Sequence, residues 1–419
     1  MGGDLKDLVT PAEVLRVVQK IHGSSCKLLD FEVEKGTTSV QGFLSNILRV
    51  TARSESPAGQ VQSVKFIVKR FPDLPTQQKM VNDLGAFDQE IGFFEHCLPL
   101  LLKQCPDLPV VRCFYSNLAE KIIYMEDLKE QNYFAIVRSV PDLKDDILSL
   151  DHFKVMMEAL AKFHSASYGI DWVKEFPDLY QFDSAFEGSG ADFFKRVLKQ
   201  SVDSTLIPIA ELEHSGNEEL LKNIRWLASE DYFNAIQKMS KADPATVNVL
   251  CHGDFWANNM MFKIDPKTRK PLDVKLIDFQ ICRYAPPSRD VLYCISVLSV
   301  DFRQKYETQI LKFYYNAFIK SCSDLGKDCS LTWDELYRDY DRARIFGLMM
   351  TVTLRPIIYL EGNFPEGDSE LTEEQFKQLM EGGEGTEASI KAFKENEAFH
   401  NEMVSVLDDA HATITKWRQ

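Results

Sequence analysis

Residues 249–279 read VLCHGDFWANNMMFKIDPKTRKPLDVKLIDF. A short apolar run leads into a loop with the pattern His-x-Asp-x-x-x-x-Asn, formed by His252, Asp254 and Asn259. A polar hairpin tip follows, and a second apolar run ends in Asp278, nineteen residues after Asn259. This order of residue types is typical of a kinase-type phosphotransfer centre.

Each polar side chain of this stretch matches a task in phosphoryl transfer. The Asp254 carboxylate is predicted to accept or orient the proton of an acceptor hydroxyl. The Asn259 amide oxygen and the Asp278 carboxylate are hard oxygen donors, as a Mg²⁺ site requires. His252 is predicted to fix the loop through hydrogen bonds. Each residue alone is also compatible with a turn or a structural role, so the prediction depends on the combination.

A lysine and an acidic residue upstream complete the expected charges. Lys69 ends the apolar sequence Phe-Ile-Val-Lys, where a kinase fold carries the lysine that contacts phosphates. Glu90, one position before Ile91 on a predicted helix, is its expected partner. Glu95 and Asp88 on the same helix are the alternatives.

Two further segments are assigned to the nucleotide. A turn with Gly42, Ser45 and Asn46 is predicted to cover the phosphates through its backbone amides. It has a single glycine and is also compatible with a plain hairpin turn. The last strand before the helical region is the expected interlobe hinge, where backbone groups of Glu126 and Leu128 are predicted to hydrogen-bond an adenine edge.

Charge and cysteine content narrow the expected partners and the expected location of the protein. The chain has 48 Lys and Arg against 63 Asp and Glu, a net charge of −15. Such an excess argues against a nucleic-acid partner or an anionic membrane surface, and no obligate protein partner is expected. The nine cysteines show no Cys-x-x-Cys pair, so reduced thiols and a cytoplasmic location are predicted. The longest apolar stretch, at 345–360, is interrupted by Arg355 and Pro356.

At 419 residues the chain exceeds one compact core and is expected to form two lobes. Residues 1–126 are predicted to form a small α+β lobe with an antiparallel sheet and one main helix. A capping box at 10–13 starts a first helix. Strands are expected at 28–33, 43–52, 61–71, 110–115 and 121–125, and helices at 11–22 and 87–101.

Residues 127–419 are predicted to form a large, mostly helical lobe, so the fold class is α+β with a two-lobed, protein-kinase-like architecture. The acidic segment 361–387 is expected to be a solvated loop around a short helix. Helices are predicted at 150–168, 191–202, 218–240, 290–300, 302–323, 333–360, 373–380 and 387–417.

The residues after Asp278 favour a small acceptor over a protein substrate. Protein kinases continue from Asp-Phe-Gly through a long activation loop to Ala-Pro-Glu. Here Gln280 replaces that glycine, and only eleven residues separate Asp278 from Asp290. Asp290 is predicted either to brace the catalytic loop or to cap its own helix. The short segment leaves little room for a peptide-docking platform.

Several motifs resemble those of one family. Cys-His-Gly-Asp-Phe-Trp-Ala-Asn-Asn-Met-Met-Phe at 251–262 resembles the signature of the ecdysteroid kinase-like family, also called CHK kinase-like, within the choline and aminoglycoside kinase superfamily. Leu-Ile-Asp-Phe-Gln at 276–280 and Leu-Ala-Lys-Phe-His at 160–164 resemble further landmarks, as do Glu-Asp-Leu at 126–128 and Ser-Arg-Asp at 288–290.

The resemblance implies a two-lobed kinase-like fold. It also implies transfer of the γ-phosphate of ATP, with Mg²⁺, to a hydroxyl of a small molecule, such as an ecdysteroid or a similar apolar alcohol. A choline or ethanolamine kinase is the alternative enzyme, although no aromatic or acidic cage for a cationic acceptor stands out. A non-catalytic, ligand-binding relative of the kinase fold is the alternative outside enzymes.

The sequence also contains candidate residues for an acceptor pocket. Trp256 of the catalytic loop is expected to contribute to it. Tyr340, Arg344 and Met349 are predicted to lie on about one and a half faces of a long helix and to form part of an apolar, methionine-rich wall. Core packing between helices is the alternative for these side chains.

Overall fold

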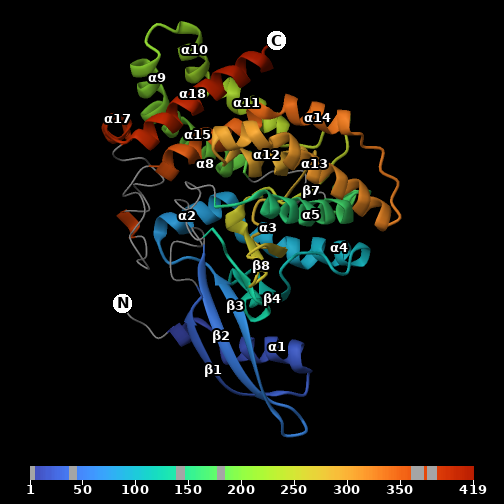
Figure 1. Cartoon of the computed structure of the whole chain (residues 1–419). Coiled ribbons are helices and arrows are strands. Elements are labelled where there is room, and N and C mark those ends of the chain that lie inside the picture. The colour runs from blue at the N-terminus through green and yellow to red at the C-terminus, as the bar shows by residue number, and fades with distance from the viewer. Residues whose placement is uncertain (1–4, 37–44, 138–146, 177–184, 360–371, 375–384) are drawn as a thin grey trace.

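A computed structural model describes residues 5–36, 45–137, 147–176, 185–359, 372–374 and 385–419. It has two lobes, one built on a sheet and the other mostly helical (Figure 1). The predicted α+β, two-lobed fold class is therefore confirmed. The division of domains at residue 126 stays a prediction, and strand β5 ends at that residue.

The small lobe contains a five-stranded antiparallel sheet in the order β1-β2-β3-β5-β4. β3 is a central strand, paired with β2 at one edge and with β5 at the other. Phe66 and Val68 of β3 are fully buried. The strands are β1 (Lys27–Lys35), β2 (Asn46–Glu55), β3 (Val61–Arg70), β4 (Cys113–Asn117) and β5 (Ile122–Glu126).

Helix α1 (Pro11–His22) packs against this sheet and begins with the predicted capping box. The Thr10 hydroxyl accepts a hydrogen bond from the Glu13 backbone N–H, and the Glu13 carboxylate accepts one from the Thr10 N–H at 3.0 Å. Val14, Val17 and Val18 recur at helical spacing and are buried with the sheet core. This one-sided apolar stripe explains why the helix docks on the sheet.

The main helix of the small lobe is interrupted, unlike the single helix predicted at 87–101. α3 (Ala86–Gly92) continues into a π-helical turn (Phe93–Cys97) and then into α4 (Leu98–Gln104). Pro99 has no N–H to donate to the carbonyl four residues earlier, so a regular helix cannot continue through it. α2 (Pro75–Leu84), between β3 and α3, was not predicted.

In the large lobe, α5 (Leu150–Ser167) lies along α13 (Val300–Asp324). Three predicted long helices are each two helices. Ser229 and Asn396 break two of them by starting a new helix as side-chain N-caps, and the third ends its first part at Ala343. The observed pairs are α10 (Glu218–Trp226) with α11 (Glu230–Met239), α14 (Trp333–Arg342) with α15 (Arg344–Tyr359), and α17 (Gly385–Glu395) with α18 (Glu397–Trp417).

The remaining helices of this lobe include α8 (Gly188–Ser201), which lies beside α2 of the small lobe, and α12 (Ser288–Ser296), which packs on α15. α9 (Ile207–Glu213) follows α8 after a second π-helical turn. Pro208 is the second residue of α9, so this turn, like the first, precedes a proline.

The predicted catalytic stretch forms short strands between the helices. β8 (Met260–Ile264) and β9 (Pro271–Leu276) form the expected hairpin, and β6 (Tyr133–Phe134) adds a third strand to it. β7 (Val249–Cys251) pairs with β10 (Arg283–Ala285). The Leu276 N–H donates to the Pro109 carbonyl at 2.8 Å, which ties β9 to the segment that leads into β4.

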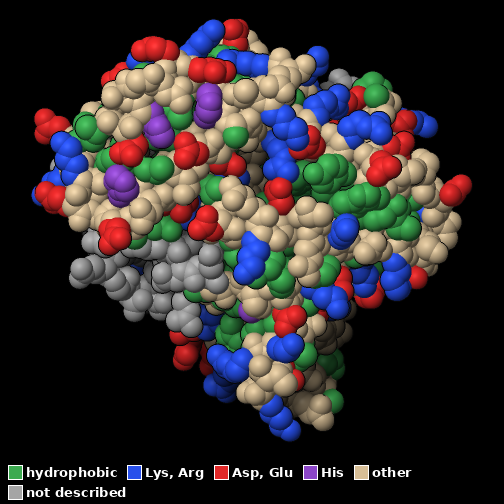
Figure 2. Space-filling model, turned by 45° about the horizontal axis from the view of Figure 1, so that its top comes forward, with side chains coloured by type: hydrophobic (Ala, Val, Ile, Leu, Met, Phe, Trp, Pro, Cys, Tyr) green, Lys and Arg blue, Asp and Glu red, His purple; other side chains and the backbone are tan. Residues whose placement is uncertain are grey.

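Three predicted features lie wholly or mostly outside the described residues: Gly42, the acidic segment at 361–387 and the helix at 373–380 within it. Within the described ranges, no helix is long and apolar enough to cross a membrane. Acidic and basic side chains are interspersed over the face in Figure 2. That face therefore shows no surface of a single charge sign.

Candidate active site

Three charged side chains meet between the lobes. The Lys69 ammonium on β3 lies 2.6 Å from Glu90 Oε2 on α3 and 2.7 Å from Asp278 Oδ1 after β9. Lys69 and Glu90 are buried, whereas 29% of the Asp278 side chain is exposed. Of the two alternatives to Glu90, Glu95 accepts a hydrogen bond from the Ser116 hydroxyl and Asp88 is exposed.

These three side chains are two acids and one base, and their burial favours a net charge of zero. Burial raises the pKa of Glu90 to about 7; the Lys69 charge opposes this and the Asp278 charge adds to it. Burial alone would lower the pKa of Lys69, but the charges of Asp278 and Glu90 outweigh it and raise that pKa. We therefore expect Lys69 to stay charged at neutral pH.

The raised pKa of Glu90 predicts a pH-dependent effect on stability. The folded protein keeps a proton on Glu90 up to about pH 7, whereas an ordinary glutamate loses it near 4.5. The folded state therefore binds more protons between these values, so the contribution of Glu90 to stability falls as pH rises through this window. Glu90→Gln lacks this titration. Thermal denaturation of the wild type and Glu90→Gln gives a Tm for each protein. The Tm of the wild type minus that of Glu90→Gln should be smaller at about pH 8 than at about pH 5.

Glu95→Gln is the matched control, since Glu95 is an exposed glutamate on the following turn. Its Tm difference from the wild type should vary less over the same pH range. A difference for Glu90→Gln that is constant with pH contradicts the raised pKa.

The loop after β7 holds its polar side chains by hydrogen bonds within the loop. Asn259 Nδ2 donates to the Asp254 backbone carbonyl at 3.0 Å and to Asp254 Oδ2 at 2.7 Å. His252 Nε2 lies 3.0 Å from the Ile277 carbonyl, which can only accept, so this nitrogen carries the proton. His252 Nδ1 then accepts from the Asp254 N–H at 3.3 Å.

Asp254 is partly buried and lies beside a second donor that sequence reasoning missed. Tyr293 of α12 hydrogen-bonds its carboxylate. Burial raises the pKa of Asp254, while the bonds from Tyr293 and Asn259 favour the ionised form. No local pattern in the sequence singles out Tyr293 for this contact.

Asp290 braces the backbone of the same loop, which is one of the two roles predicted for it. Its Oδ2 accepts from the His252 N–H at 2.7 Å and its Oδ1 from the Gly253 N–H at 2.9 Å. His164 Nε2 lies 3.0 Å from Asp290 Oδ2, and His164 Nδ1 lies 2.8 Å from the Tyr314 hydroxyl. Burial lowers the pKa of His164, so it donates to Asp290 as a neutral ring. Burial acts to raise the pKa of Asp290, but the bonds from His164 and Gly253 hold it below its ordinary value.

The backbone at Asp278 is unusual. Its φ of 70° lies in the left-handed region, which few residues other than glycine adopt. The next residue, Phe279, is fully buried and stacks on Phe93 of the π-helical turn, with ring centroids 4.0 Å apart. Its ring also lies 4.7 Å from that of His252. Phe279 therefore anchors Asp278 to the helix that carries Glu90.

The comparison with known protein families fits this site. A family model described as the ecdysteroid kinase-like family matches residues 39–327, which is more than half of the chain. The chain belongs to the ecdysteroid kinase-like family. The match includes Lys69, the loop that carries Asp254 and Asn259, and Asp278, and the family relationship supports a small-molecule kinase.

This ecdysteroid kinase-like chain is also similar to other proteins. It is 24% identical over 330 residues to a Caenorhabditis elegans protein named uncharacterized oxidoreductase dhs-27, covering 72% of this chain and 36% of that one. The chain thus spans about a third of the length of this curated relative. A Plasmodium vivax ethanolamine kinase is 12% identical with a TM-score of 0.40, covering 98% of this chain and 86% of the other. Choline kinase LicA from Streptococcus pneumoniae is 13% identical with a TM-score of 0.38, covering 93% and 99%.

The predicted nucleotide residues of this ecdysteroid kinase-like chain lie at the ends of strands. Ser45 is buried, and Asn46, the first residue of β2, donates to Asp73 at 2.8 Å. The Glu126 N–H donates to the Arg112 carbonyl at 3.0 Å, and Leu128 is buried in the segment after β5. Phosphate and adenine contacts at these residues stay predictions.

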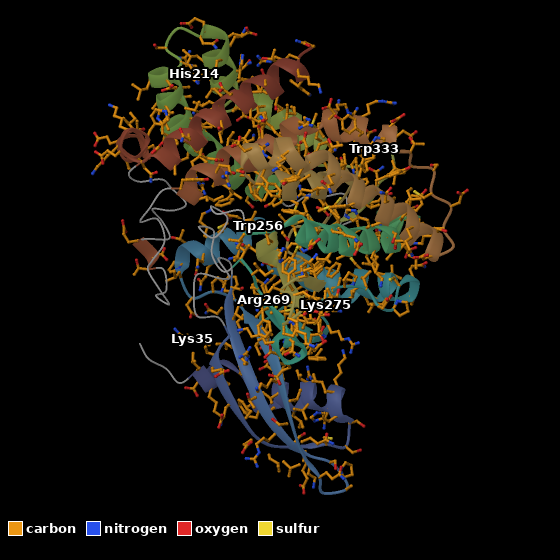
Figure 3. The ribbon with its side chains drawn as sticks, in the orientation of Figure 1. Lys35, His214, Trp256, Arg269, Lys275 and Trp333 are labelled. Carbon is orange, nitrogen blue, oxygen red and sulfur yellow. The ribbon has the colours of Figure 1, made fainter. Side chains whose placement is uncertain are left out.

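The predicted acceptor residues lie in different places. Trp256 is half-buried in the loop after β7, and Figure 3 shows it where the two lobes meet. Tyr340 lies on α14, one helix before the other two, and Met349 is buried in α15. Arg344 binds both carboxylate oxygens of Glu307, at 2.9 and 2.6 Å. Their role in a pocket stays a prediction, and Arg344 already has a structural partner.

Proposed function

We propose that the protein transfers the γ-phosphate of ATP, with Mg²⁺, to a hydroxyl of a small molecule. The observation that carries this proposal is the meeting of Lys69 and Asp278 next to a loop that holds Asp254 and Asn259. The family relationship supports it, and the motif resemblance favours an ecdysteroid or a similar apolar alcohol as acceptor.

The residues present fit both Mg²⁺ and the phosphates of ATP. Asp278 and Asn259 offer oxygen atoms, the donors that Mg²⁺ prefers. The carboxylate of Asp278 is partly exposed and lies beside the Lys69 cation, so a metal and phosphate oxygens can approach the same point. When bound, Mg·ATP supplies the phosphoryl group and neutralises its charge.

The side chains of this site then have distinct tasks. Asp254 accepts the proton of the acceptor hydroxyl at a carboxylate oxygen, and its raised pKa makes it a stronger base than an exposed aspartate. Asn259 holds Asp254 in place through Nδ2 and would turn its amide oxygen to the metal. Glu90 orients Lys69, whose ammonium would contact the phosphates.

The direct test is incubation with Mg·ATP and a panel of steroid alcohols, simple apolar alcohols, choline and ethanolamine. Mass spectrometry should detect a phosphorylated steroid or apolar alcohol, gaining one phosphate per modified hydroxyl. If only choline or ethanolamine is phosphorylated, the acceptor is a cationic alcohol and the proposed apolar acceptor is wrong. Binding of a steroid without Mg·ATP binding or product would contradict a kinase and favour a non-catalytic relative.

A further inference from the structure

We propose that Gln280 is a positioning residue of the metal site: it holds Asp278 by one carboxylate oxygen and leaves the other oxygen directed to the cleft. The inference deepens the proposed function, because it concerns the carboxylate that would bind Mg²⁺. Gln280 stands where a protein kinase has the glycine of Asp-Phe-Gly, so the usual residue there has no side-chain donor.

Two donors converge on the same atom of Asp278. The Lys69 ammonium lies 2.7 Å from Oδ1, and the Gln280 side-chain amide Nε2 donates to the same Oδ1. Both donors are buried, whereas 29% of the Asp278 side chain is exposed. The carboxylate is therefore held from its buried side, and Oδ2 is the oxygen left to face the open side.

The two donors differ in what happens when a nucleotide binds. Phosphate oxygens attract the Lys69 ammonium, because it is a cation, and compete with Asp278 for it. The Gln280 amide is neutral and the residue is only 7% exposed, so phosphate oxygens attract it weakly. Gln280 is thus the donor that keeps Asp278 oriented once Lys69 turns to the phosphates. Because it carries no net charge, it repels a cation at the site less than the Lys69 ammonium does.

Gln280→Met tests this role, since methionine has a similar size and no N–H donor. The probe is Mn²⁺, whose binding to the protein with a non-hydrolysable ATP analogue is measured by electron paramagnetic resonance. We expect the Kd for Mn²⁺ to rise about 10-fold to 100-fold, the usual effect of removing a hydrogen bond to a metal ligand. In turnover assays the Mg²⁺ requirement should rise, while the KM for the acceptor stays within about twofold.

Gln60→Met is the matched control, because Gln60 is exposed in the turn between β2 and β3. It should leave the Mn²⁺ affinity unchanged. If the Tm of Gln280→Met shows that this variant does not fold, Gln280→Leu is a second variant without a donor. Wild-type Mn²⁺ affinity in a folded Gln280 variant overturns this inference alone. Failure of the wild type to bind Mn²⁺ with the analogue overturns the proposed function together with it.

Discussion

Asp254→Asn should lower kcat by about 100-fold to 10,000-fold, the range that a positioned general base contributes. Asparagine keeps the size of the side chain and can still accept from Asn259 Nδ2, so the loop should remain folded. It cannot accept the proton of the acceptor hydroxyl. We expect the KM for ATP to change little, because Lys69 and Asp278 are untouched. Rates of phosphorylated product formed by each variant, followed by mass spectrometry, give these values.

Asp301→Asn is the matched control for this substitution. Asp301 is an exposed aspartate in the first turn of α13, and its replacement should leave kcat within about twofold. An Asp254→Asn protein with a normal Tm and a kcat within about threefold of the wild type would show that Asp254 is not the base.

Gly253→Ala should disrupt the catalytic loop more than any single side-chain deletion around it. A Cβ at this position would lie 1.8 Å from the Ile281 carbonyl oxygen, a distance at which backbone must move. The φ of +87° is also unfavourable for alanine. Since the Gly253 N–H donates to Asp290, the shift would also loosen the brace on His252. We expect a lower Tm and loss of measurable turnover.

Gly326→Ala separates the two causes. Gly326 has a similar φ of +67°, but a Cβ there would meet no atom within 4 Å. This variant therefore measures the cost of the backbone conformation alone, and its turnover should stay near that of the wild type. Equal losses of Tm in the two variants would show that close packing against Ile281 is not the reason for glycine at 253.

Local sequence patterns were sufficient where neighbouring residues decide the structure. Thr10 and Glu13 form the predicted capping box because both partners lie within one helical turn. The β8–β9 hairpin was predictable because two apolar runs flank a polar tip. Helix ends were less predictable: Ser229 and Asn396 start new helices inside stretches with continuous helical spacing. An N-cap competes with helix continuation, and spacing alone does not show which will prevail.

By itself, the sequence determined the order of the motifs that carry the proposed catalytic residues, the two-lobed fold class and the short segment between Asp278 and Asp290. Only the tertiary structure decided which side chains are partners. Lys69 and Asp278 meet across 209 residues, and His164 reaches Asp290 across 126. These pairs depend on how strands and helices that are far apart in the chain pack together. The free energy of a buried charge depends on the groups packed around it, and a linear sequence does not show them.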